Sequence, residues 1–84
     1  MWLVKFSSMD NIEFNAVDIE DLMLLITEYV GEDKEFFRKA MQGFQAAEDK
    51  ETQYIRLFNS IFARHNSEDI VAIYKIEAKY KEEI

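Results

Sequence analysis

The chain has 84 residues, of which 49% are hydrophobic, and it carries 17 acidic side chains against 10 lysines and arginines. This size and hydrophobic content exclude a disordered chain and indicate that residues 1–84 form a single compact domain. The net charge of −7 disfavours direct binding to nucleic acid or to anionic membranes, and the absence of cysteine excludes disulfides and thiol chemistry.

The first predicted elements are two strands joined by a tight turn. Residues 2–8 (WLVKFSS) and 11–17 (NIEFNAV) alternate apolar and polar side chains, which is the pattern of a half-buried strand. Met9, Asp10 and Asn11 predict a hairpin turn, because Asp and Asn tolerate the left-handed backbone of such turns. The core side of this hairpin would carry Trp2, Val4, Phe6, Ile12, Phe14 and Ala16.

Three helices are expected next, because the apolar spacing changes to three and four residues. The first is capped by Asp18 and stopped by Gly31, which lacks the Cβ that disfavours left-handed backbone. The second is predicted near residues 33–46 and the third near residues 49–65. The second and third helices could instead form one long helix. The apolar helical pattern is interrupted over residues 45–53, which favours two helices.

The C-terminal residues 68–84 fit either a helix or a strand. As a helix they would place Glu77 and Lys81 within the apolar face, whereas as a strand they alternate cleanly, so we predict a strand. Its core side would carry Ile70, Ala72, Tyr74, Ile76, Ala78 and Tyr80. The opposite, open face of the sheet would carry Leu3, Lys5, Ser7, Glu13, Asn15, Val71, Ile73, Lys75 and Glu77.

These elements predict an α+β fold in the order ββαααβ. The three-stranded sheet would be antiparallel or mixed, with three helices on one face. The open face and the two sheet edges could then pair two copies into a homodimer.

Nine of the 17 acids fall at the predicted helix starts, where unpaired N–H groups and the helix dipole favour negative charge. Each predicted helix start carries a cluster of three acids, and the cluster of the third helix is Glu48, Asp49 and Glu51. One cap per helix does not account for three acids per helix, so we expect acidic ridges that contact a basic protein partner. The expected contacts are Asp18, Glu20, Asp21, Glu32, Asp33 and Glu35.

No catalytic, metal or cofactor site is predicted. The acids at residues 18–21 run directly into an apolar helix and cannot wrap around an ion as a calcium loop does. His65, the only histidine, is expected at a helix end, and neither Ser60 nor Ser67 lies in a nucleophile motif. Six aromatic residues of the predicted helices are spaced as core residues. They do not alternate with Lys and Arg, as aromatics that stack on nucleic-acid bases do. These are Phe36, Phe37, Phe44, Tyr54, Phe58 and Phe62.

The segments that would direct the chain to a membrane are also not predicted. The N-terminal residues lack the pattern of a signal peptide, and the longest apolar run, residues 22–26, is too short for a membrane span. We therefore expect a cytoplasmic protein.

A compact acidic chain without a catalytic motif resembles the small inhibitors made by phages and other mobile elements, such as anti-CRISPR proteins. The resemblance lies in size, charge and lack of motifs, and it transfers no functional residue. It implies a non-enzymatic inhibitor that imitates the charge of nucleic acid and docks on a basic, nucleic-acid-binding effector. The alternative is a homo-oligomeric structural or regulatory module whose acids only cap helices.

Overall fold

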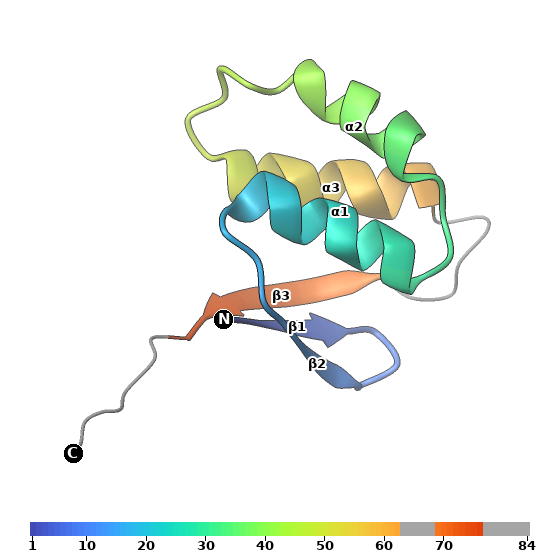
Figure 1. Cartoon of the computed structure of the whole chain (residues 1–84), viewed down its shortest axis with the longest axis vertical. Coiled ribbons are helices and arrows are strands. Elements are labelled where there is room, and N and C mark those ends of the chain that lie inside the picture. Colours follow the sequence, from blue (N-terminus) through green and yellow to red (C-terminus); the bar gives the residue numbers. More distant parts are fainter. Residues whose placement is uncertain (63–68, 77–84) are drawn as a thin grey trace.

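The computed structural model describes residues 1–62 and 69–76 and confirms the α+β fold (Figure 1). The predicted positions of His65 and of the last strand beyond residue 76 lie outside these residues. The elements follow the predicted order ββαααβ: β1 (Trp2–Phe6), β2 (Asn11–Phe14), α1 (Ile19–Tyr29), α2 (Lys34–Gln42), α3 (Lys50–Phe62) and β3 (Ile70–Lys75).

The sheet has the order β2-β1-β3, and β1 pairs with both neighbours in antiparallel fashion, so the mixed alternative is excluded. Trp2 lies opposite Phe14 on one side and opposite Lys75 on the other. The Lys75 ammonium lies 5.5 Å from the centroid of the Trp2 ring. Lys75 therefore contacts a core-side residue and does not occupy the open face, where the alternation had placed it.

A bulge in β3 changes the register that the sequence predicted. Lys5 pairs with Ala72, but the next residue, Phe6, pairs with Ile70, so Val71 is an additional residue on β3. One inserted residue moves every following side chain to the other face of the sheet.

The predictions that Ile73 lies on the open face and that Ala72, Tyr74 and Ile76 lie on the core side are therefore wrong. Ile73 is opposite Val4 and is only 9% exposed, whereas Tyr74 is opposite Leu3 and is 55% exposed. The sequence gives no sign of this bulge, because residues 70–74 are apolar or aromatic at every position and fit either face of the strand.

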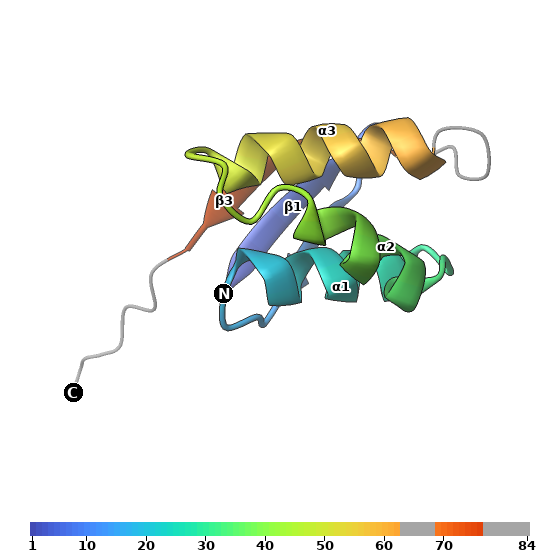
Figure 2. The same ribbon diagram turned by 90° about the horizontal axis from the view of Figure 1, so that it is seen from above.

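The helices form two layers on the same side of the sheet. α1 contacts β2 and α3 contacts β3, while α2 packs across α1 and α3 (Figures 1 and 2). The fully buried core between these layers includes Leu22 and Ile26 of α1, Phe37 of α2, and Tyr54 and Phe58 of α3.

Asp18 caps α1 as predicted, and one acid from each of the other two predicted clusters, Asp33 and Asp49, caps α2 and α3. The carboxylates of Asp18, Asp33 and Asp49 accept hydrogen bonds from backbone N–H groups two or three residues ahead, at 2.8–3.2 Å. These bonds satisfy N–H groups that have no partner within the helix. The helix starts are therefore fixed by local chemistry.

Gly31 ends α1 as predicted, with a left-handed φ of +83°. Its N–H donates to the carbonyl of Glu28 at 3.0 Å, and the N–H of Glu32 donates to the carbonyl of Thr27 at 2.9 Å. This pair of bonds is the Schellman motif, which turns the chain sharply into α2.

α2 is shorter than predicted and ends at Gln42 instead of near Ala46. The N–H groups of Gly43, Phe44 and Ala47 each donate to the carbonyl three residues back, so the chain closes in tight turns. Glycine has low helix propensity, which favours a stop at this point. The prediction of two separate helices is confirmed.

Two further side chains differ from the expectation. Phe36 is 53% exposed although its spacing predicted core, while Phe37 is fully buried. Neighbouring residues on a helix point about 100° apart, so α2 buries only one of the two. In the hairpin turn, the left-handed residue is Met9 (φ 75°) and not Asp10 or Asn11.

Candidate functional site

The starts of α1 and α3 lie together at one end of the molecule. Both helices run in the same general direction and α2 runs back between them (Figures 1 and 2). The Lys50 ammonium of α3 lies 3.3 Å from the Glu20 carboxylate of α1. We call the six carboxylates of these two helix starts the acidic end: Asp18, Glu20, Asp21, Glu48, Asp49 and Glu51.

Only one cation, Lys50, belongs to these two helix starts, so six negative side chains and one positive side chain leave a formal charge of −5. Burial, and then the nearby charge of Asp49, raise the pKa of Glu51. The hydroxyl and the backbone N–H of Thr52 lower the pKa of Asp49. The acidic end is thus a region of like charges that partly repel one another.

Glu20 connects the acidic end to the core. Its Oε2 accepts hydrogen bonds from the Tyr54 hydroxyl at 3.1 Å and from the Lys50 ammonium at 3.3 Å. Burial alone would raise the pKa of Glu20, but hydrogen bonds from its own backbone N–H, from Tyr54 and from Lys50 outweigh burial and lower it. Glu20 is therefore a fixed negative charge at neutral pH.

Tyr54 is fully buried, and its hydroxyl donates to Glu20. Burial first, and then the hydrogen bond to Glu20 and the charges of Glu20 and Asp18, raise the pKa of Tyr54 to about 12. The hydroxyl is consequently protonated at neutral pH and acts as a hydrogen-bond donor to the acidic end.

A pocket of about 270 Å³ opens beside Glu20 between the three helices. Its wall carries a carboxylate, a guanidinium, two amides and a few apolar groups. The lining residues are Glu20, Leu24, Arg38, Met41, Gln42, Gln45 and Tyr54.

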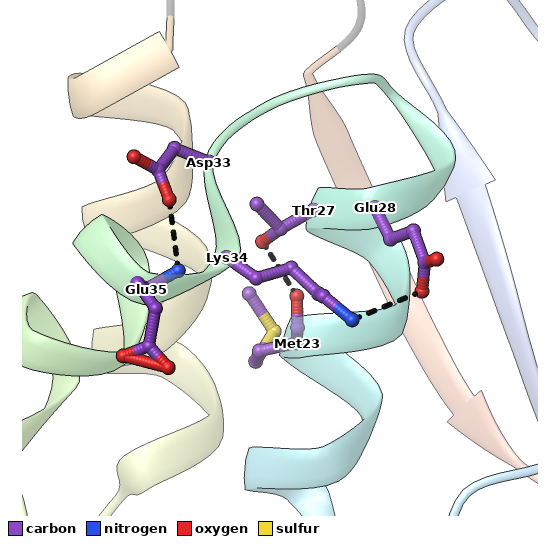
Figure 3. Close-up of polar contacts among 6 residues, drawn as sticks. All are labelled: Met23, Thr27, Glu28, Asp33, Lys34 and Glu35. Carbon is purple, nitrogen blue, oxygen red and sulfur yellow. Dashed lines mark hydrogen bonds and ion pairs between the residues drawn. The ribbon is translucent and has the colours of Figure 1, made fainter.

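The acids at the start of α2 lie at the other end of α1, which is 11 residues and about 16 Å long. Figure 3 shows the Lys34 side chain pointing from α2 to Glu28 of α1, and away from Asp33. The Lys34 ammonium lies 3.4 Å from the Glu28 carboxylate, and the Arg38 guanidinium lies 3.2 Å from Glu35. Here the cations offset part of the acid charge.

The predicted contact residues therefore fall into two groups. Asp18, Glu20 and Asp21 belong to the acidic end, together with the acids of α3. The other predicted contacts, which the structure keeps apart from this group, are Glu32, Asp33 and Glu35.

A second pocket of about 270 Å³ lies between the start of α2 and the end of α3. It combines two carboxylates with three apolar side chains. We call it the α2 pocket: Glu32, Asp33, Phe36, Ile61 and Phe62.

Sequence reasoning missed the contact between the α1 and α3 starts and the roles of Lys50 and Tyr54. The acid cluster that opens α3 was visible, and three consecutive helices with short links commonly alternate in direction. That alternation would have placed the first and third helix starts at one end. The Tyr54 hydroxyl gave no signal, because a core tyrosine has the same spacing as a core phenylalanine.

Comparison with family models, with curated protein sequences and with solved structures finds no match for this chain. Among residues 1–62 and 69–76, no three Asp, Glu or His side chains lie close enough together to hold a metal ion. None of the helices in the described part of the chain has the length and apolar character needed to span a membrane.

Proposed function

We propose that the protein is a non-enzymatic, cytoplasmic inhibitor that docks its acidic end on a basic, nucleic-acid-handling protein. The observation that carries this proposal is the meeting of two helix starts in one surface with six carboxylates and one lysine. Such a surface concentrates negative charge at one end of the molecule, and a nucleic-acid backbone is also strongly negative.

Electrostatics explains what this surface would do. Complementary charge accelerates association and selects the partner more than it raises the final affinity. Exposed charges are screened over about 8–10 Å at physiological salt, so binding would weaken as salt increases. The Tyr54 and Lys50 hydrogen bonds keep Glu20 in place, so part of this surface is preorganised.

The test is a pull-down with the tagged chain from a nuclease-treated lysate of the source cells, followed by affinity measurement on the captured protein. The variant Asp21→Asn/Glu48→Gln neutralises two charges of the acidic end without removing a helix cap. The control Asp10→Asn/Glu13→Gln removes the same charge from the hairpin. Asn at residue 21 keeps an oxygen for the Val17 N–H, which donates to this side chain at 3.1 Å.

We expect a basic partner whose Kd rises about 5- to 30-fold with the first variant and less than about 2-fold with the control. High salt should release the wild-type complex. Equal effects of the two variants, or binding that salt does not weaken, would show that the acidic end is not the contact surface.

A second function is supported by the open face of the sheet. Leu3 is partly exposed at its centre and Tyr74 is half exposed beside it. By alternation along β1 and β3, the half-exposed Met1 and the partly exposed Ile76 continue the same face. An apolar surface of this kind is typical of an interface, so a homo-oligomeric structural or regulatory module is the second candidate.

A further inference from the structure

The α2 pocket has an apolar floor and wall. Phe62 is almost fully buried at the end of α3, Ile61 is partly buried beside it, and Phe36 of α2 leaves half of its surface open to solvent. A half-exposed phenylalanine at a pocket offers a flat ring to whatever enters. The floor provides apolar surface for an aliphatic chain.

No cation within residues 1–62 and 69–76 forms an ion pair with the carboxylates of the α2 pocket. Within the part of the chain that the structure describes, Glu32 makes no ion pair, and Asp33 uses only Oδ1, which caps the N–H groups of Glu35 and Phe36. Two cations of α2 are engaged elsewhere, since Lys34 pairs with Glu28 and Arg38 pairs with Glu35. Figure 3 shows Lys34 directed away from Asp33.

We propose that the α2 pocket receives an arginine side chain of the partner. This inference rests on the proposed function, because the basic partner supplies the arginine. The aliphatic stem would pack on Ile61 and Phe62, and the guanidinium would lie against the Phe36 ring within reach of Glu32.

Arginine fits this pocket better than lysine. Its guanidinium is planar, stacks on aromatic rings and is less strongly hydrated than an ammonium group, and it can bind a carboxylate through two N–H groups. An acidic or neutral side chain would leave Glu32 and Asp33 uncompensated.

The inference is tested by NMR titration of the full chain with the peptide acetyl-Gly-Arg-Gly-amide. Two matched peptides replace arginine with lysine or with citrulline, which has nearly the same shape but no charge. We expect the arginine peptide to shift the backbone amides of residues 32–36 and 61–62, with a Kd on the order of 1–10 mM. The lysine peptide should bind more weakly, and the citrulline peptide should cause no shift at these residues.

Variants separate the pocket from general electrostatics. Glu32→Gln should raise the Kd of the arginine peptide about 2- to 5-fold, and Phe36→Leu should reduce the preference for arginine over lysine. Glu35→Gln removes the same charge from α2 outside the pocket and should change the Kd much less. Shifts confined to the acidic end, equal effects of Glu32→Gln and Glu35→Gln, or equal binding of citrulline would overturn the inference.

The peptide titration and the pull-down test the two proposals separately, so either proposal can be refuted without the other. Asp21→Asn/Glu48→Gln should leave the shifts at residues 32–36 in place, because it alters the other end of α1. If the pull-down yields no basic partner but the peptide still binds, the proposed function is wrong and the pocket remains an arginine site. If a basic partner is captured but the arginine peptide does not shift these amides, the pocket inference is wrong and the proposed function stands.

Discussion

Tyr54 shows how one side chain joins the core to the charged surface. Its ring is fully buried between the helices, and its hydroxyl donates to Glu20 at 3.1 Å. A buried hydroxyl without a partner would destabilise the fold, so Glu20 serves the core as well as the acidic end.

The variant Tyr54→Phe tests this connection. We expect the free energy of unfolding near neutral pH to fall by about 1.5–3 kcal/mol, because one hydrogen bond to a charged group is lost. The pKa of Tyr54 is raised from 10.0 to about 12 in the folded chain. The folded state thus favours the protonated hydroxyl, and this stabilisation is complete below the unfolded pKa and is lost as the pH rises through the folded pKa.

Urea unfolding of the wild type and of Tyr54→Phe should therefore converge as the pH increases from the ordinary tyrosine pKa to about 12. The control is Tyr74→Phe, which removes a hydroxyl from a half-exposed tyrosine and should leave stability almost unchanged. A constant difference between wild type and Tyr54→Phe across this pH range would contradict the assignment.

At the scale of single elements, the two glycines end their helices in backbone conformations of opposite hand. Gly31 ends α1 in left-handed backbone, whereas Gly43 ends α2 in ordinary right-handed backbone with φ −68°. Neither site is sterically closed: a Cβ at residue 31 meets nothing within 4 Å, and a Cβ at residue 43 meets the Ala40 carbonyl at 3.6 Å. Backbone conformation alone therefore decides what a substitution does.

Gly31→Ala should destabilise the fold by about 1–2 kcal/mol, because alanine is disfavoured in left-handed backbone. Gly43→Ala should stabilise it by about 0.4–1 kcal/mol, because alanine fits this backbone and restricts the unfolded chain. Thermal and urea unfolding of both variants measure these changes. Effects of the same sign would be inconsistent with the two backbone conformations.

At the scale of the whole molecule, the two candidate functions use different surfaces. The helices all lie on one side of the sheet (Figure 1). The other side carries Leu3 and its cross-strand neighbour Tyr74, which are partly and half exposed. The acidic end lies at the helix starts and not on this face. An inhibitor would bind through the acidic end and the α2 pocket, whereas an oligomeric module would use the open face.

Sedimentation velocity separates the two functions. Under the inhibitor function we expect a monomer of 10.0 kDa at every concentration, with Tyr74→Lys no different from the wild type. A mass that grows with concentration and is restored to monomer by Tyr74→Lys would favour the oligomeric module. Ile73→Lys is unsuitable for this purpose, because it places a charge at a buried position beside Val4 and should unfold the chain.

The sequence by itself determined the features that depend on near neighbours in the chain. The order ββαααβ followed from the change of apolar period after the hairpin. Asp18 was predicted as a cap, and the acid clusters predicted at the other two helix starts contain the caps Asp33 and Asp49, because a cap bonds N–H groups two or three residues away. Gly31 was readable as a stop for the same reason. About half of the acidic end was also named in advance, through the α1 acids.

Only the tertiary structure decided which distant residues meet. The additional residue Val71 moved Ile73 into the core, and packing of α2 on two helices left Phe36 exposed while it buried Phe37. The same packing joined the α3 acids to Glu20 and separated Glu32 from them. These outcomes depend on contacts between elements far apart in the chain. The apolar periodicity of a strand or helix shows which face is buried, but it does not specify the element that packs against that face.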